Sequence, residues 1–393
     1  MLNTNRVIQR YKLDSRFAKE IDKGILISML LLIMFGILNI YLCTKGEVFP
    51  VLGPFYFTKR QIIWFLISMV ALYIILTVDY RVIYNYIPII YWASVILLLM
   101  VWIPKVGVEV NGARGWIDLK ICLFQPSEIA KYGIILMVAK LLNEMDYKIN
   151  DIRNLLRLGF YIAVPVFFIL LQRDMGMTMV CFFIVLGMFF IAGLDKRVII
   201  GGLSVLAIGI VFVWYSGLLG GYRADRINSF LNPEEYADDL SYQYTQGVIG
   251  IGAGGLTGID KSFDSDIDPG YAGTNVPEIQ TDFIFSAIAE QWGFIGGVFV
   301  LLLYGVLITK MIVISRNCGD RFASIVCVGV ISYFMFAVTQ NIGMTIGLLP
   351  ITGITLPLIS YGGSSLLTTV IGVAMVLNIS MRKKKILFKR EIA

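Results

Sequence analysis

A carboxylate at the edge of an apolar run is the first place in this sequence where chemistry is expected. Asp282 directly follows Thr281 and precedes a long apolar run, with Glu278 four residues earlier. A carboxylate that is partly removed from water has a raised pKa and can act as a general base. An aspartate that only caps the following helix would have the same residue type. The residues alone leave both interpretations open.

A second polar group opens another apolar run. Pro126, Ser127 and Glu128 stand where a helix is expected to begin, because proline and acidic side chains favour the first helical turn. Lys131 lies three residues after Glu128, so the two side chains share a helix face and can pair. Polar groups at membrane depth are costly and are therefore functional candidates. Glu128 and Lys131 could equally form an ion pair that serves only the structure.

Two further candidates lie at turns. Arg173 and Asp174 form a polar turn between apolar runs, where they either serve a substrate or are simply solvated. Residues 356–365 carry Ser360 and Ser364 beside a proline and two glycines. Non-helical backbone at membrane depth is tolerated where it is buried or lines a cavity. The backbone amides and hydroxyls of this segment would suit an anion such as a pyrophosphate. The alternative is that the segment only starts a helix.

Several kinds of site are excluded by composition. The chain has no histidine, which removes Ser-His-Asp triads, Cys-His dyads and imidazole metal sites. Its five cysteines show no CxxC spacing and are expected to be ordinary small apolar residues. Cys43 and Cys122 are predicted on the same outer side, but their spacing does not show whether they pair. No P-loop or Walker motif occurs, and no nucleotide, haem or zinc is expected.

Membrane-spanning helices must position these residues. Hydrophobic residues make up 58% of the 393 residues, charged residues make up 15%, and the mean hydropathy is +0.79. A soluble domain has about 25% charged residues, so lipid must be the solvent for most of this surface. About 20 apolar residues cross a bilayer. This length predicts an all-α integral membrane fold with ten spans, near residues 24–43, 61–78, 83–103, 127–143, 157–171, 177–194, 198–219, 282–308, 322–342 and 364–381.

Positive charge sets the predicted orientation. With the N-terminus in the cytoplasm, 22 of the 33 Lys and Arg residues lie on the inner side and 10 on the outer side. Positive charge favours the cytoplasm, so both termini are predicted to be cytoplasmic, and the net charge gives no reason to expect nucleic acid. The expected parts are a basic N-terminus (1–23), one membrane domain (24–381) with an extracytoplasmic loop (220–281), and a basic tail (382–393).

Seven motifs occur together in the order typical of one family. They are NGARGWIDL at 111–119, FQPSEIAK at 124–131, QRDMG at 172–176, YRADRINSFLNPE at 222–234, IGIGAGGLTGID at 249–260, PEIQTDFIF at 277–285 and NIGMTIGLLPITGITLPLISYGGSS at 341–365. With these stretches the chain resembles the SEDS family (shape, elongation, division and sporulation), and RodA more than FtsW or SpoVE.

The resemblance implies a peptidoglycan glycosyltransferase that polymerises lipid II at the outer face of the cytoplasmic membrane. In this family the aspartate of the TDFIF motif is regarded as catalytic, and it falls on Asp282 here. The family's tryptophan before the QPSE motif falls on Trp116. The implied partners are a class B penicillin-binding transpeptidase and other membrane proteins of an elongation or division complex.

This chain departs from the family pattern at two positions. Arg173 stands where family members commonly have proline, so that turn is expected to differ. Gln280 stands where they often have histidine. A histidine at this position therefore cannot be essential to the chemistry, which places the weight on Asp282.

The implied reaction needs positive charge. A departing lipid pyrophosphate requires cationic side chains or a divalent metal, and Mg²⁺ or Mn²⁺ held loosely by oxygen ligands is expected. A lipid II flippase and a non-catalytic scaffold are the alternative functions. Beside Asp282 as the base, the residues expected to bind the substrate are Arg114, Trp116, Glu128, Lys131, Asp174, Arg223, Arg226, Glu278, Ser360 and Ser364.

Overall fold

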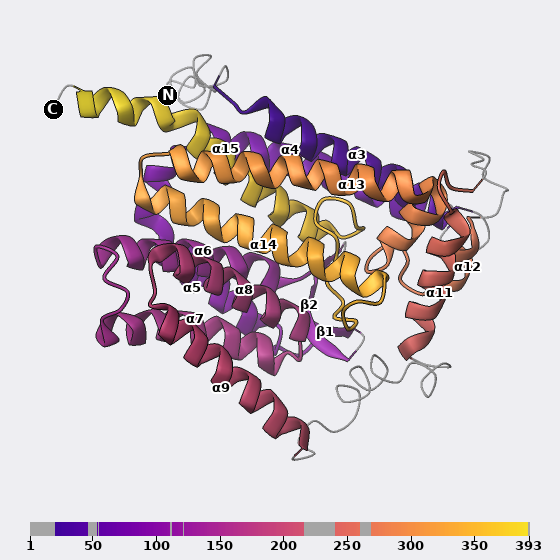
Figure 1. Ribbon diagram of the computed structural model, residues 1–393, viewed down its shortest axis with the longest axis horizontal. Coiled ribbons are helices and arrows are strands. Elements are labelled where there is room, and N and C mark those ends of the chain that lie inside the picture. The colour runs from indigo at the N-terminus through magenta and orange to yellow at the C-terminus, as the bar shows by residue number, and fades with distance from the viewer. Residues whose placement is uncertain are drawn as a thin grey trace.

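The molecule is a bundle of long helices (Figure 1). The computed structural model describes residues 20–45, 53, 55–110, 112–120, 122–215, 240–259 and 269–391. Among these residues, eight helical segments are long and apolar enough to cross a membrane. They are α3 Lys23–Thr44, α4 Tyr56–Thr77, α5 Tyr80–Met100, α7 Ile152–Leu171, α8 Met175–Ala192, α13 Ile284–Asn317, α14 Arg321–Thr345 and the first part, Gly363–Arg382, of α15 Gly363–Glu391.

Two more helices lie where spans are predicted. They are α6, Pro126–Glu144, and α9, Lys196–Tyr215. The composition of α6 differs from that of the eight others because it carries Glu128, Lys131, Lys140 and Glu144. The ten-span count therefore stays a prediction, supported by ten long helices in the predicted order.

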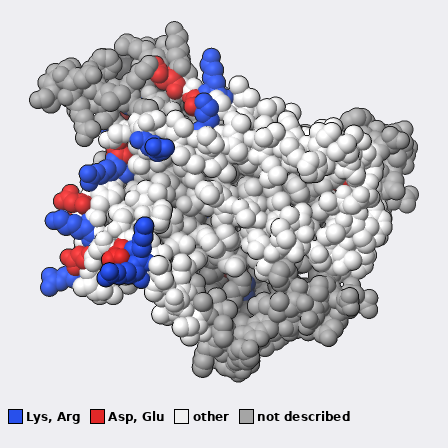
Figure 2. All heavy atoms as spheres, viewed as in Figure 1, with Lys and Arg blue, Asp and Glu red and all other residues white. Residues whose placement is uncertain are grey.

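The two ends of the bundle differ in chemistry. α3 begins and α15 ends at one end, which we call the termini end (Figure 1). The strands, α11 Leu240–Gly254 and α12 Tyr271–Asn275 lie at the opposite end, which we call the strand end. On the face shown in Figure 2, charged side chains gather at the termini end, and the middle of the bundle is a broad uncharged belt. Such a belt is the surface that lipid requires.

Aspartates start several of the helices. Asp22, Asp79, Asp151, Asp174 and Asp320 are the N-caps of α3, α5, α7, α8 and α14, and each side chain accepts a hydrogen bond from a backbone N–H of the first turn. A carboxylate at this position satisfies donors that the helix itself leaves unpaired.

The central helices are α14 and α15. In the most apolar stretch of each, 72% and 78% of the residues are buried. α8 packs along α14, α4 along α15, and α5 along α6. α3 packs along α13, far away in sequence, and there the indole of Trp292 donates a hydrogen bond of 2.9 Å to the Asn39 side-chain oxygen. The first and eighth predicted spans are therefore neighbours.

The span predicted near residues 282–308 falls in α13, which is not one continuous helix. α13 is interrupted at Gly293, whose φ of 65° and ψ of −163° are not helical. A side chain at this position would place its Cβ 2.5 Å from backbone atoms of Leu256 and Gly258. The apolar run after Asp282 therefore forms first a short buried helix, residues 284–292, and then a longer helix, residues 294–317.

A small sheet at the strand end was not predicted. β1 Gly107–Val110 pairs with β2 Ala113–Asp118, and β2 pairs with β3 Leu123–Phe124, both antiparallel.

All five cysteines are free, so Cys43 and Cys122 do not pair.

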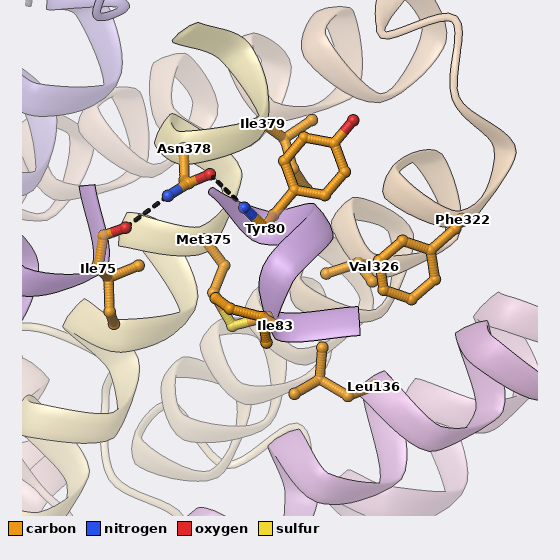
Figure 3. A pocket seen from close by; sticks show the side chains of 9 residues that line it. All are labelled: Ile75, Tyr80, Ile83, Leu136, Phe322, Val326, Met375, Asn378 and Ile379. Carbon is orange, nitrogen blue, oxygen red and sulfur yellow. Dashed lines mark hydrogen bonds between the residues drawn. The ribbon is translucent and has the colours of Figure 1, made fainter. Parts of the chain in front are cut away.

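A junction at the termini end joins α15 to the turn between α4 and α5 (Figure 3). The Asn378 amide donates to the carbonyls of Ile75 and Val78, and its oxygen accepts from the Tyr80 N–H. The Arg382 guanidinium donates to the Leu76 carbonyl. A small apolar cavity lies beside Asn378 and is lined by side chains of α4, α5, α6, α14 and α15. Side chains of α15 thus satisfy carbonyls at the end of α4.

Candidate functional site

The segment that links α14 to α15, residues 346–362, connects the polar motifs at the strand end. Its backbone is non-helical from 351 to 362, as the sequence predicts for this motif. Leu358 has a φ of 72° and Gly353 a φ of 70°. We call residues 346–362 the linking segment.

Asp282 lies against this linking segment. The Asn341 amide donates to the Asp282 carbonyl at 2.8 Å and to the Ile354 carbonyl at 2.7 Å. The Asp282 side chain is half-buried, and its Oδ2 lies 3.5 Å from the position that a Cβ on Gly353 would occupy. The main chain of Asp282 is therefore fixed by α14, and its carboxylate faces a glycine that leaves room beside it.

Asp282 does not occupy the N-cap position of α13. The N-cap of α13 is Phe283, whose side chain makes no capping hydrogen bond. Asp282 lies one residue earlier, in a turn in which its N–H donates to the Glu278 carbonyl at 3.1 Å. The five aspartates described above occupy the N-cap position of their helices, and Asp282 lies one residue before that position.

Glu278 shapes the turn that carries Asp282. Its backbone is left-handed, with a φ of 55°, and its carbonyl accepts from the N–H groups of Thr281 and Asp282. Its carboxylate accepts from the Thr281 hydroxyl at 3.0 Å and from the Gln280 amide at 3.5 Å. The Glu278 side chain is exposed, so it borders the site from the solvent side.

Ser360 is held inside the protein. Its hydroxyl donates to the Thr281 carbonyl at 2.6 Å and accepts from the Leu356 N–H at 2.8 Å. Gln61 of α4 donates to the Ser360 carbonyl at 3.1 Å and accepts from the Gly362 N–H at 3.3 Å. With its proton already donated, Ser360 positions the turn before Asp282. Direct binding of a substrate by its hydroxyl would require breaking these bonds.

The predicted pair of Glu128 and Lys131 is confirmed. The Lys131 ammonium lies 2.6 Å from the Glu128 carboxylate, and both side chains are buried. Thr368 of α15 donates to the same carboxylate oxygen at 2.7 Å, and the ring of Tyr333 lies 3.7 Å from the ammonium. Coulombic attraction and hydrogen bonds offset the cost of burying the two charges.

Asp174 is not a simply solvated turn residue. Its carboxylate accepts from the Gln125 amide at 2.9 Å, from the Met177 N–H at 2.9 Å and from the Ser127 hydroxyl at 3.4 Å. Burial raises the pKa of Asp174, and these hydrogen bonds oppose that rise only in part. Arg173, in contrast, is exposed and has a φ of 64°.

The Asp174 group and the linking segment are in contact. A Cβ on Gly176, at the start of α8, would lie 2.7 Å from the Thr352 carbonyl. The Ser364 hydroxyl accepts from the Gln125 N–H at 3.2 Å. One stretch of chain, running from 350 to 364, therefore touches both the Asp282 turn and the Asp174 group.

The remaining predicted substrate residues lie apart from this contact or outside the described chain. Arg114 and Trp116 are half-buried on β2, where the Arg114 guanidinium lies 5.5 Å from the ring centre of Trp102. The Arg114 N–H donates to the Gln172 carbonyl and so ties the sheet to the turn before Asp174. Arg223 and Arg226 fall outside the described residues.

Sequence reasoning missed the amide side chains. Gln61, Gln125 and Asn341 each bridge two segments of the site. Gln61 and Asn341 are buried, and both stand within or beside apolar runs. A polar amide at membrane depth is the signal that would have identified them.

The described residues do not form a closed metal site. No three Asp, Glu, Cys or His side chains within the described ranges converge as a ligand set. Asp282 and Glu278 offer carboxylate oxygens near the solvent side of the turn, but the described geometry does not assemble a ligand cage. The expected Mg²⁺ or Mn²⁺ stays a prediction.

Comparison with known proteins gives a consistent result. The family model described as cell cycle protein, covering FtsW, RodA and SpoVE, matches residues 23–385. Stage V sporulation protein E of Bacillus subtilis is 36% identical over 375 residues, which cover 91% of this chain and 96% of that protein. The probable peptidoglycan glycosyltransferase FtsW of Haemophilus influenzae is 38% identical over 320 residues, covering 80% and 78% of the two chains.

Solved structures agree with this assignment. A chain from a peptidoglycan synthase complex, studied for the structural coordination of polymerization and crosslinking, superposes with a TM-score of 0.77 and 30% identity, covering 92% of this chain and 98% of that chain. The rod shape determining protein RodA of Thermus thermophilus gives a TM-score of 0.68 with 28% identity, covering 92% and 97%. This multi-pass membrane protein therefore belongs to the FtsW, RodA and SpoVE family of cell cycle proteins, the SEDS family.

Proposed function

We propose that this chain is a peptidoglycan glycosyltransferase that polymerises lipid II, with Asp282 as its general base. The observation that carries the proposal is the setting of Asp282. Its main chain is fixed by Asn341, and its half-buried carboxylate lies one residue before the N-cap of α13, against the linking segment. Relatives that cover most of this chain are named as probable peptidoglycan glycosyltransferases.

The reaction is a displacement at a sugar carbon. The acceptor hydroxyl gives its proton to the Asp282 carboxylate while its oxygen bonds to the anomeric carbon of the donor. The bond between that carbon and the pyrophosphate oxygen breaks, and the lipid pyrophosphate leaves with the electron pair. A positioned base contributes about 10²–10⁴-fold to such a step.

Negative charge on the departing pyrophosphate must be stabilised. Arg114 at the strand end and the sequence-predicted Arg223 and Arg226 are the cationic candidates, and a loosely bound Mg²⁺ or Mn²⁺ would supply the same charge. Lys131 is already paired with Glu128, so its contribution to phosphate binding requires that this pair open.

A transpeptidase is the proposed partner. A structural neighbour of this chain belongs to a complex in which polymerization and crosslinking are coordinated. The proposed chemistry of this chain makes only glycosidic bonds. A class B penicillin-binding protein would supply the cross-links, and glycan made by the purified chain alone is expected to be uncross-linked.

A single assay separates the proposed function from its alternatives. The purified protein is placed in proteoliposomes with fluorescent lipid II, and both polymer and lipid orientation are measured. Glycan polymer is the expected product. Lipid II that crosses the bilayer without polymerising would show a flippase, and the absence of both activities would show a scaffold.

The orientation also belongs to this proposal, because lipid II would be polymerised outside the membrane. Thr257 is exposed at the strand end. After Cys43 and Cys122 are replaced, Thr257→Cys should react with a membrane-impermeant thiol reagent in intact cells. Labelling only after lysis would reverse the orientation and contradict polymerisation on the outer face.

A further inference from the structure

Glu290 is a buried carboxylate that the proposed reaction does not use. It stands in the last turn of the short helix 284–292, and its side chain is 1% exposed. Its Oε1 accepts from the Tyr271 N–H at 2.6 Å, and its Oε2 accepts from the Ala272 N–H at 2.9 Å. One carboxylate therefore binds the first two backbone donors of α12.

Neighbouring residues are shaped around this contact. Gly270 has a φ of 96°, and a Cβ at this position would lie 2.9 Å from Oε2 of Glu290. The next side chain, Gln291, donates to the Pro269 carbonyl at 2.9 Å. We call these contacts of Glu290 and Gln291 with Pro269, Tyr271 and Ala272 the clasp.

The clasp closes a loop around the proposed base. From Tyr271 to Glu290 the chain passes through α12, the Glu278 turn, Asp282 and the short helix, and it returns to its start at the clasp. The other side of the short helix is also fixed, because the Ile259 N–H donates to the Glu290 carbonyl at 3.1 Å. The loop that carries Asp282 is thus tied at both of its ends.

We propose that Glu290 is a positioning residue for the transfer reaction, which holds α12 and the Glu278 turn in the place that Asp282 requires. This inference rests on the proposed function of Asp282. A carboxylate is suited to the task because both of its oxygens accept hydrogen bonds. The carboxamide of glutamine has one acceptor, and its NH₂ would face a backbone N–H.

The direct test measures whether the clasp holds α12. Val276, one residue after α12, is 4% exposed. In a chain in which Cys43 and Cys122 have been replaced, Val276→Cys should react slowly with an impermeant maleimide. Adding Glu290→Gln should raise the labelling rate at least tenfold, whereas Glu144→Gln, the same change at an exposed pair of the termini end, should not. Unchanged labelling with Glu290→Gln would overturn the proposal.

The second test measures whether the clasp acts through Asp282. Glu290→Gln should lower kcat for lipid II polymerisation about 10–100-fold, the scale that a misplaced catalytic group produces, with KM nearly unchanged. In an Asp282→Asn background the same change should have no further effect, because the base is already absent. Two outcomes would show that Glu290 does not position Asp282. One is an unchanged kcat in Glu290→Gln, and the other is a double variant whose loss in kcat is the product of the two single losses.

A backbone variant keeps the proposal testable if Glu290→Gln fails to insert. Tyr271→Pro removes one of the two donor N–H groups at a helix position that tolerates proline. Tyr271→Ala is its control, since it loses the same side chain but keeps the N–H. Only the proline variant should label faster and polymerise more slowly, and equal behaviour of the two would overturn the role of the clasp. Asp282→Asn with the parent rate would instead contradict the proposed role of Asp282 as the base.

Discussion

Two buried asparagines, one at each end of this bundle, are satisfied differently. At the termini end, Asn378 uses both halves of its amide, donating to two carbonyls and accepting from one N–H. At the strand end, Asn341 donates to two carbonyls, but its Oδ1 has no partner. The side-chain oxygens of Gln172 and Gln280 are likewise buried without a partner.

This difference separates a structural polar cluster from a functional one. Buried polar atoms in folded proteins are nearly always hydrogen-bonded, so an unpaired one calls for a ligand or an ordered water. The acceptors left open at the strand end border the Asp282 turn and the turn before Asp174. Each of them calls for a donor from a ligand or an ordered water, whereas the Asn378 amide at the termini end is paired on both halves.

The largest contrast is expected between two aspartates at opposite ends. Asp282→Asn removes the proposed base while keeping its size, and lipid II polymerisation should fall about 10²–10⁴-fold. Asp320→Asn keeps a side chain that caps helices equally well, so its rate should stay close to that of the parent. Both rates are measured on purified, correctly inserted protein. A parent-like rate for Asp282→Asn would transfer the role of base to Glu278 or Glu128.

The ion pairs of the two regions should differ in how much they contribute to stability. Glu128→Gln leaves the buried Lys131 ammonium without its counter-charge, which should lower the free energy of unfolding by about 3–5 kcal/mol. Asp79→Asn breaks the 3.5 Å pair with Arg382. It should cost only about 1 kcal/mol, because Asp79 is 32% exposed and the buried Arg382 keeps its bonds to the Leu76 and Asn378 carbonyls. Denaturation in detergent micelles measures both. Equal losses would mean that the Glu128 pair is no more buried in solution than the Asp79 pair.

The two asparagines provide a closer comparison. Asn378→Leu leaves two carbonyls and one N–H unpaired, and should cost about 3 kcal/mol of stability without changing the rate per folded molecule. Asn341→Leu also unpairs two carbonyls but removes an acceptor that had no partner, so its stability loss should be smaller. Its polymerisation rate should fall about tenfold or more, because the main chain of Asp282 is no longer fixed. A loss of rate in Asn378→Leu, with stability intact, would contradict the assignment of Asn378 to a purely structural cluster.

The smallest effect is expected from the pH dependence of Asp174. Because burial raises the pKa of this carboxyl, the folded protein binds its proton more readily than the unfolded chain does. Stability should therefore fall as the pH rises from the ordinary aspartate value through the raised pKa, and then level off. Asp174→Asn should lack this fall. Thermal unfolding of both proteins over mildly acidic pH measures it, and parallel curves would contradict the raised pKa.

Much of the fold was predictable, because bilayer thickness fixes the length of an apolar helix. The pair of Glu128 and Lys131 was predictable from helical spacing alone. The break at Gly293 was not, since a single glycine inside an apolar run does not distinguish a kink from a close helix contact. The clasp was not predictable either, because its donors are backbone N–H groups, which have no signature in the sequence.

The amide contacts of the site show a second limit. Gln61 contacts residues almost 300 positions later in the chain, and Asn341 contacts Asp282 across 59 positions. Each amide could be identified as a costly polar group, but its partners are set by how the helices pack. The sequence therefore identified Asp282 as a candidate base without showing what holds it.

The contact between Asn39 and Trp292 has a consequence for how the protein is made. The two residues are 253 positions apart, and at about 5–20 residues per second roughly 10–50 s pass between their synthesis. During this interval α3 waits in the bilayer without its principal neighbour, with the Asn39 amide oxygen still lacking its indole donor. This early helix is therefore among the last to reach its final environment, and a ribosome stalled before Trp292 would leave it exposed to lipid or to quality-control proteases.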